Sequence, residues 1–233
     1  IIPKQYVDFM SQLAPQVQLD YNRVAPLYTD EQYAAMGQKA KLVDVLNSPL
    51  LRLLNVRYVM TSKQFTMPSE LTQENARSIP AWQLAYEDEA VRIWEHWYFP
   101  RAYVAEPTGT EAPTLKLDWA VGSEVMVASD TGREKLLQAN VSPTVTHSWV
   151  VLSETFIPGW RAFVRPLGGT KDSERPLEAV KVMDNFIGVN VSPDVVQKAF
   201  ADIHDELPEA ERAALDKGEL RLGVSYSPPS FQI

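Results

Sequence analysis

One stretch of the chain, residues 149–164, constrains the fold more than any other. It begins with the apolar run Trp-Val-Val-Leu, whose length and composition are typical of a strand covered on both faces. Pro158 and Gly159 then supply a turn, and a second strand leaves from Trp160. A strand, a tight turn and a second strand in so few residues predict a domain built mainly from β-structure.

Further strands are expected along much of the chain. The runs that carry β-type patterns are residues 56–61, 101–105, 115–128, 163–164, 186–191 and 220–226. The last run is the clearest, because its apolar side chains alternate with small or polar ones: Leu220, Leu222, Val224 and Tyr226. Between the strands, residues 133–139 are expected to be helical.

A hairpin is predicted from residues 82–87 and 90–95, with its turn at Asp88-Glu89. Side chains on a strand alternate between the two faces of the sheet. Three side chains of the first strand are therefore expected to share one face: Trp82, Leu84 and Tyr86.

Residues 1–46 carry helical signals. An amphipathic stripe with i, i+3, i+4, i+7 spacing is formed by Tyr6, Phe9, Met10 and Leu13. Thr29 is expected to be the N-cap of a second helix, because Asp30 and Glu31 follow it and favour the helix dipole. A third helical stretch is expected over residues 38–54.

A helical segment is also expected near the C-terminus, at residues 193–217, between the last two predicted strands. Ser192 followed by Pro193 is a typical helix start, and Gly218 is a natural end. The sequence thus predicts an α+β chain with two domains. Residues 1–80 form a helical or αβ N-terminal lobe, and residues 81–233 form an antiparallel, jelly-roll-like β-sandwich with the helical insertion.

Composition excludes several classes of function. The formal net charge of -8 argues against nucleic-acid binding, because phosphate neutralisation needs a basic surface. No apolar run approaches the roughly 18–20 residues that span a bilayer, and no signal peptide is visible. The absence of cysteine excludes thiol chemistry, disulfides and Cys-ligated metals.

The sequence carries no catalytic or metal-binding signature. His96, His147 and His204 are far apart, and none belongs to a two-histidine metal motif. The acidic run at residues 87–89 lacks the spacing of a calcium loop and is interpreted as a solvated turn. No catalytic residue, metal site or cofactor is therefore expected.

Aromatic side chains are the best binding candidates. Trp97, Tyr98 and Trp160 beside Arg161 suit the stacking of sugar rings and the recognition of hydroxyl groups. The alternative is that these rings seal the sandwich edges and the join between the two lobes. The residues alone leave both interpretations open.

Five segments, in order along nearly the whole chain, resemble one family. They are Ile1-Ile-Pro-Lys-Gln-Tyr-Val-Asp-Phe-Met10, Leu53-Leu-Asn-Val-Arg-Tyr-Val59, Trp94-Glu-His-Trp-Tyr-Phe-Pro-Arg-Ala-Tyr-Val104, Ile157-Pro-Gly-Trp-Arg-Ala-Phe-Val164 and Gly218-Glu-Leu-Arg-Leu-Gly-Val-Ser-Tyr-Ser-Pro228. Together they are similar to the extracytoplasmic C-terminal portion of YfhO-type bacterial membrane proteins, multi-pass proteins related to polyprenyl-phosphate-dependent glycosyltransferases. Two segments depart from the family pattern: residues 164–169 and the long insertion at 193–217.

The resemblance implies an extracytoplasmic location, in the periplasm or on the outer face of the cytoplasmic membrane, with anchoring by transmembrane helices absent from this sequence. It places the catalytic acidic residues in loops between those helices, so the isolated chain is expected to be non-catalytic. The implied partners are its own transmembrane domain and an envelope glycan or lipid-linked sugar. The expected function is to support envelope glycan transfer and to bind the acceptor glycan.

Two other functions fit the same residues. One is a stand-alone carbohydrate-binding β-sandwich module that uses Trp160, Arg161, Trp97 and Tyr98 as contacts. The other is a structural or protein-interaction domain in which the insertion at 193–217 is the partner surface.

Overall fold

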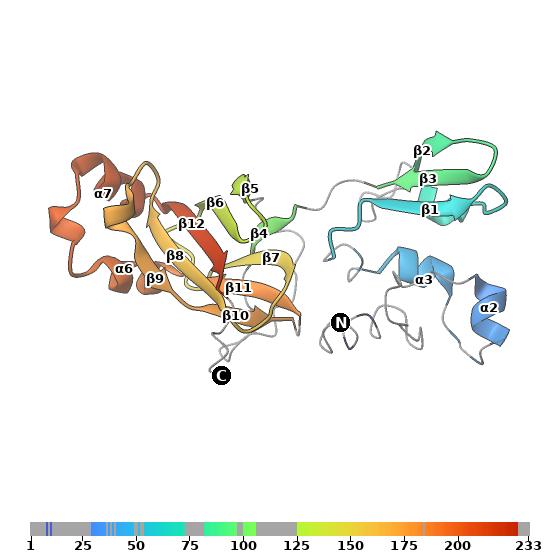
Figure 1. Cartoon of the computed structure of the whole chain (residues 1–233), viewed down its shortest axis with the longest axis horizontal. Helices are drawn as coiled ribbons and strands as arrows, with labels where there is room; N and C mark the ends of the chain where they lie inside the picture. The colour runs from blue at the N-terminus through green and yellow to red at the C-terminus, as the bar shows by residue number, and fades with distance from the viewer. Residues whose placement is uncertain are drawn as a thin grey trace. The chain divides into compact units, whose positions relative to one another are not determined.

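A computed structural model of the chain describes residues 8, 10, 29–35, 37, 39, 41–48, 51, 54–72, 82–96, 100–105, 125–183 and 185–227. The chain divides into two compact units, Ile1–Phe99 (unit 1) and Pro100–Ile233 (unit 2). Figure 1 shows the elements of each unit. The fold is mixed, with mostly antiparallel β-sheets and few helices among the described residues.

The described helices of unit 1 are short: α2 (Asp30–Ala35), α3 (Leu42–Leu46) and α5 (Ser69–Thr72). The predicted N-cap of α2 is confirmed. The Gln32 N–H donates to Thr29 Oγ1 at 3.3 Å, and the Thr29 N–H donates to Gln32 Oε1 at 2.9 Å. This reciprocal pair satisfies two donors that a helix start would otherwise leave open.

The other helical predictions for unit 1 are confirmed only in part. Within the predicted stretch 38–54, α3 spans five residues. Asn55, the first residue after this stretch, has a positive φ of 56°. Of the stripe predicted near the N-terminus, Met10 is helical and buried. Its other members, Tyr6, Phe9 and Leu13, lie outside the described residues.

A three-stranded antiparallel sheet completes unit 1, with β1 (Tyr58–Ser62), β2 (Gln83–Glu87) and β3 (Val91–Glu95) in the order β1-β3-β2. The hairpin β2–β3 is confirmed. Because β3 also pairs with β1, the hairpin belongs to the N-terminal unit. The division of the chain into two units therefore falls after Phe99, whereas the sequence patterns predicted a division after residue 80.

A β-bulge changes the faces of β2. Leu84 lies opposite Trp94, whereas Tyr86 lies opposite Ile93, with a register shift between them. Trp94 and Ile93 are neighbours on β3 and point to opposite faces, so Leu84 and Tyr86 do too. The prediction that Trp82, Leu84 and Tyr86 share one face is thus wrong, because Leu84 and Tyr86 lie on opposite faces.

Unit 2 contains two antiparallel sheets. The four-stranded sheet has the order β10-β11-β7-β4 and is built from β4 (Ala102–Ala105), β7 (Trp149–Thr155), β10 (Ala179–Val182) and β11 (Phe186–Asn190). The five-stranded sheet has the order β5-β6-β12-β8-β9 and is built from β5 (Met126–Asp130), β6 (Glu134–Asn140), β8 (Trp160–Pro166), β9 (Arg175–Leu177) and β12 (Glu219–Tyr226). The Pro158-Gly159 turn carries the chain from β7 in one sheet to β8 in the other.

One hydrophobic cluster draws residues from both of these sheets. Val150 and Leu152 of β7 enter it from the four-stranded sheet, and Leu222 and Val224 of β12 enter it from the five-stranded sheet. Each is essentially inaccessible to water, so apolar burial is the main force that holds unit 2 together. The predicted alternation of β12 and the burial of the run after Trp149 are both confirmed.

The helix predicted for residues 133–139 is wrong, because β6 occupies this stretch. Its residues are good helix formers, but alternate side chains, Lys135, Leu137 and Ala139, are buried. β6 also pairs with β12 along its whole length. Burial with period two and a complete hydrogen-bond ladder outweigh the local preference.

The predicted helical insertion is confirmed, and we call residues 193–217 the cap. It contains α6 (Pro193–Phe200), the 3-10 turn η2 (His204–Glu206) and α7 (Glu209–Asp216). Phe200 is 0% exposed and belongs to the hydrophobic cluster of unit 2. At the end of the cap, Gly218 has a φ of 71°, and a Cβ there would lie 1.9 Å from the Val141 carbonyl oxygen. Glycine is therefore required at this position.

The helix start at Ser192 departs from prediction in one respect. Pro193 is the first helical residue as expected, but the serine side chain makes no capping bond. Its hydroxyl donates to Asn190 Oδ1 at 2.6 Å and accepts the Ser148 N–H at 3.0 Å. The hydroxyl thus joins the segment after β11 to the residue before β7. A further 3-10 turn, η1 (Lys171–Ser173), precedes β9.

Candidate functional site

The Pro-Gly-Trp turn is formed as the sequence suggested. Gly159 has a φ of 113°, a conformation that residues with a Cβ rarely adopt. Its carbonyl accepts the Ser227 N–H at 2.9 Å, which ties the turn to the end of β12. The turn therefore fixes the position of Trp160 at the start of β8.

Trp160 is half-buried and is used in packing. Its ring lies 5.3 Å from the ring of Tyr226, with an interplanar angle of 53°, and it packs against the hydrophobic cluster. The indole Nε1 is buried and has no hydrogen-bond partner among the described residues. The ring thus has a structural role, and only part of it is accessible to a ligand.

Arg161 is exposed, but it does not share a face with Trp160. Trp160 lies on the same side of β8 as Ala162, which belongs to the hydrophobic cluster. Successive side chains on a strand point to opposite faces, so the guanidinium points away from the indole. The structure does not bring these two predicted contacts together, and Trp97 and Tyr98 lie outside the described residues.

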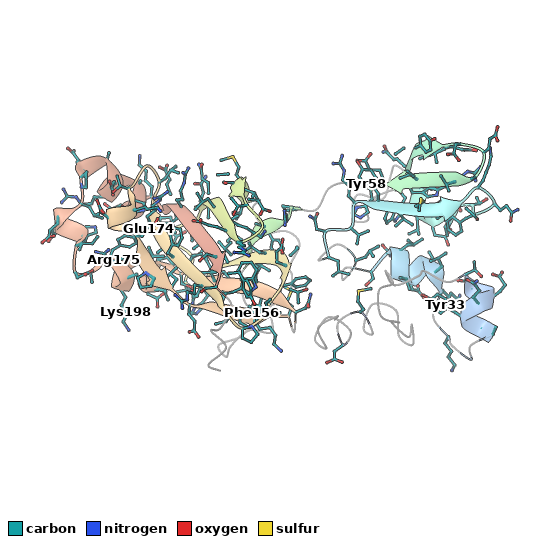
Figure 2. All side chains as sticks on the ribbon, viewed as in Figure 1. Tyr33, Tyr58, Phe156, Glu174, Arg175 and Lys198 are labelled. Atoms are coloured by element: carbon teal, nitrogen blue, oxygen red, sulfur yellow. The ribbon has the colours of Figure 1, made fainter. Side chains whose placement is uncertain are left out.

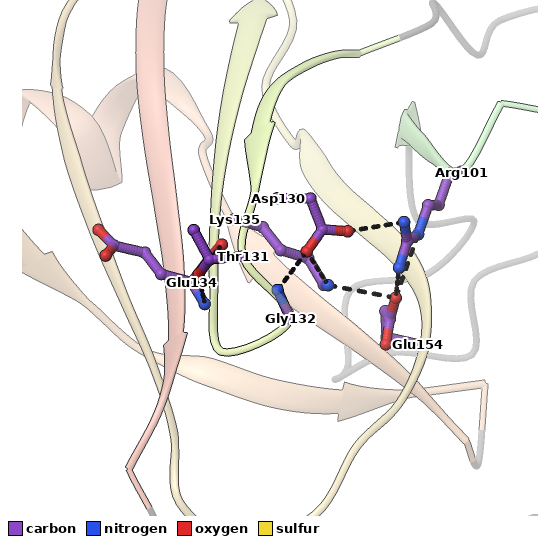
Figure 3. Close-up of polar contacts among 7 residues, drawn as sticks. All are labelled: Arg101, Asp130, Thr131, Gly132, Glu134, Lys135 and Glu154. Carbon is purple, nitrogen blue, oxygen red and sulfur yellow. Dashed lines mark hydrogen bonds and ion pairs between the residues drawn. The ribbon is translucent and has the colours of Figure 1, made fainter.

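Four charged side chains from three separate segments of the chain meet in unit 2. We call Arg101, Asp130, Lys135 and Glu154 the charged cluster (Figure 3). Lys135 is at its centre, with its side chain only 3% exposed. Its ammonium lies 2.9 Å from Asp130 Oδ1 and 3.4 Å from Glu154 Oε1. Arg101 pairs with Asp130 Oδ2 at 2.7 Å and also with Glu154.

The cluster links the two sheets of unit 2. Asp130 ends β5 and Lys135 lies on β6, both in the five-stranded sheet, whereas Glu154 lies on β7 in the four-stranded sheet. Lys135 is opposite Val224 on β12, at the far end of that strand from the cap. Charged side chains thus close the core at one end, and the cap covers it at the other.

Hydrogen bonding shapes the electrostatics of the charged cluster. The Lys135 ammonium and the Gly132 N–H, which donates at 2.7 Å, hold the pKa of Asp130 below its ordinary value. The hydrogen bond to Glu154 raises the pKa of Arg101. Two positive and two negative side chains balance each other, and both carboxylates are paired. This arrangement suits a structural link better than acid–base chemistry.

The acidic run at the β2–β3 turn has the structural role that the sequence indicated. Asp88 Oδ1 accepts the N–H groups of Ala90 and Val91 at 2.7 and 2.8 Å. Both bonds lower the pKa of Asp88, and Glu87 pairs with Arg92 at 3.2 Å. Within the described ranges, no group of acidic and histidine side chains is arranged to hold a metal ion.

The three histidines lie in different segments of the chain and have different surroundings. His96 is buried and makes an edge-on contact with the ring of Trp82, at 4.4 Å between centroids. His147 is exposed. His204 lies in the cap, with Nδ1 3.2 Å from Asp205 and Nε2 3.6 Å from Asp216.

A groove of about 420 Å³ lies between the cap and the adjacent ends of the strands in unit 2. Its size is in the range of ligand-binding pockets. Sequence reasoning identified the cap as a possible partner surface but not the groove, because its walls come from segments far apart in the chain. This groove and the charged cluster are two features of the described structure that local sequence patterns did not show.

No protein-family model, curated protein or solved structure matches this chain. In the part of the chain that the structure describes, no helix has the length and apolar character needed to cross a bilayer.

Proposed function

We propose that this chain is the extracytoplasmic, non-catalytic domain of a YfhO-type multi-pass membrane protein and supports envelope glycan transfer by the membrane-embedded part. The observation that carries the proposal is the order of the five family-like segments along the chain. Their described parts include the turn at Pro158-Gly159 and strands β1, β4 and β12. The resemblance therefore involves residues that organise the fold.

A finer description of unit 2 is part of the proposal: its two sheets form a jelly-roll-like β-sandwich with the cap over one end. The strand orders β10-β11-β7-β4 and β5-β6-β12-β8-β9 support it. So does the single hydrophobic cluster to which both sheets contribute.

Two measurements test the proposed function. The gene that encodes this chain is expected to encode several apolar segments upstream, each long enough to span a bilayer. The purified chain, incubated with activated sugar donors and envelope glycans, is expected to show no turnover. A parent gene without such segments, or robust transfer by the isolated chain, would overturn the proposal.

Carbohydrate binding is the second candidate, favoured by the exposed guanidinium of Arg161 and the accessible part of Trp160. Because these side chains lie on opposite faces, each is tested alone. A glycan array is probed with the wild-type chain, Arg161→Ala and Trp160→Ala, and with Arg133→Ala as a matched exposed control. This candidate is supported if the Arg161 or Trp160 variant loses glycan binding while the Arg133 variant retains it.

A structural or interaction role is the third candidate, and the groove beside the cap favours it. Deletion of the cap is a poor test, because it would remove Phe200 and expose the core residues that pack around this side chain. Point variants in the groove are needed instead.

A further inference from the structure

The groove beside the cap has an apolar floor. Its buried lining residues are Val141, Val191, Val196, Leu215 and Leu220. They come from the segments flanking β6 and β11, from both cap helices and from the start of β12. The free energy falls when another apolar group displaces water from an apolar surface of this kind.

Polar side chains stand at the edge of the groove. Gln197, His204 and Asp216 line it, and the imidazole of His204 lies between Asp205 and Asp216. The side chain of Asp216 is 67% exposed, and its one ion-pair partner among the described residues is His204. The lining includes no tryptophan, tyrosine or phenylalanine, so the groove is not suited to stacking on a sugar ring.

The cap around the groove is strongly acidic. Its residues 193–217 carry seven carboxylates and three lysine or arginine side chains. Six of the carboxylates are exposed. Within the described ranges, Asp202 is the one cap carboxylate that pairs with an arginine or lysine, through Arg175 at 3.6 Å. Arg175 and the outward-facing Lys198 of α6 are labelled in Figure 2.

We propose that this groove binds a basic peptide segment of a partner protein, with aliphatic side chains in the groove and lysine or arginine side chains against the cap carboxylates. The apolar floor selects the aliphatic side chains. The acidic cap selects the flanking cations and steers them to the groove. The proposal uses the geometry of unit 2 alone and does not depend on the membrane role proposed above.

The distribution of charge favours a peptide over a small cationic molecule. A single ammonium group in the groove would meet Asp216, whereas the other exposed carboxylates are spread over α6, the turn after it, η2 and α7. Only an extended ligand that carries several cations contacts many of them at once. A volume of about 420 Å³ also exceeds what one aliphatic side chain fills.

The experiment pans a phage-displayed library of random peptides against the whole purified chain. Enriched sequences are expected to combine leucine, isoleucine or valine with neighbouring lysine or arginine. The affinity of a fluorescent synthetic copy is then measured by anisotropy, and it is expected to fall as salt is added.

Two tryptophan substitutions separate groove binding from general effects. Ala201 is exposed and lines the groove, so Ala201→Trp fills it and is expected to weaken binding by roughly tenfold or more. Ala213 is also exposed, on α7, but does not line the groove, so Ala213→Trp is the matched control and is expected to bind like wild type. Gln197→Trp blocks the same groove if Ala201→Trp does not fold.

Charge is tested with Asp216→Asn, which is expected to weaken binding several-fold at low salt and much less at high salt. The proposal is overturned if no peptide is enriched, or if the enriched peptides are acidic. Equal binding by Ala201→Trp and Ala213→Trp also refutes it. Hexylamine that binds as tightly as the peptide would show that the ligand is a small amine instead.

Discussion

Replacement of Lys135 by methionine tests whether the charged cluster holds the two sheets of unit 2 together. The Lys135 side chain is 3% exposed, and its ammonium lies 2.9 and 3.4 Å from two carboxylates. Each attraction is worth about 5 kcal/mol at an effective dielectric constant of about 20. Desolvation of the buried ion cancels most of this gain.

The expected net loss of stability for Lys135→Met is about 3 kcal/mol, at the low end of the range for breaking a buried ion pair. The estimate is low because Asp130 and Glu154 keep about a quarter of their side chains in contact with water and retain Arg101 as a partner. The loss is measured by urea unfolding followed through tryptophan fluorescence. The control is Lys181→Met, an exposed lysine on β10, for which a change within about 0.5 kcal/mol is expected.

A double-mutant cycle and a pH series sharpen the test. Lys135→Met combined with Asp130→Asn should cost less than the sum of the single changes, with a coupling energy of about 1–2 kcal/mol. The folded-state pKa of Asp130 is lowered, so its stabilising effect is present above the unfolded pKa of about 3.9 and is lost as pH falls through the folded value. The difference between wild type and Lys135→Met should therefore shrink below about pH 4. Additive single changes, or a loss no larger than that of Lys181→Met, would refute the reasoning.

Three further substitutions test packing in unit 2, each by urea unfolding. Gly223→Ala should cost about 1–3 kcal/mol, because the added Cβ would lie 1.9 Å from the ring of Phe163; a neutral result would show that the ring moves freely. Phe200→Ala should cost about 3–5 kcal/mol, since it empties a fully buried site, and a cost below about 1 kcal/mol would show that the cap is not anchored in the core. Trp160→Ala should cost about 2–3 kcal/mol, because the half-buried indole packs on Tyr226 and the hydrophobic cluster. An unchanged stability would mean that these packing contacts contribute nothing to the fold.

Local signals in the sequence were sufficient to predict much of the fold. The N-cap at Thr29 depends on Gln32, a residue three positions away. The helical insertion begins at Pro193 and ends at Gly218, and these two residues themselves predict its limits. The hairpin β2–β3 and the alternation of β12 are likewise set by neighbouring residues. Each of these features needs no information about distant parts of the chain.

Features that depend on distant contacts were missed. Residues 134–140 have helix-forming side chains and became a strand because β12 pairs with them. The bulge after Leu84 is set by its pairing with β3. The members of the charged cluster are spread over more than fifty positions, and no spacing rule brings them together. Trp160 and Arg161 were predicted to act jointly, although strand geometry sends them to opposite faces.

The cap has one consequence for finding what this protein binds. Its side chains form both a wall of the groove and a part of the core, since Val196 and Leu215 belong to each. A ligand bound in the groove contacts residues that are brought together only in the folded chain. It therefore binds the folded state and not the unfolded one, and mass action must raise the melting temperature. A thermal-shift screen therefore reports occupancy directly, whatever the chemical class of the ligand.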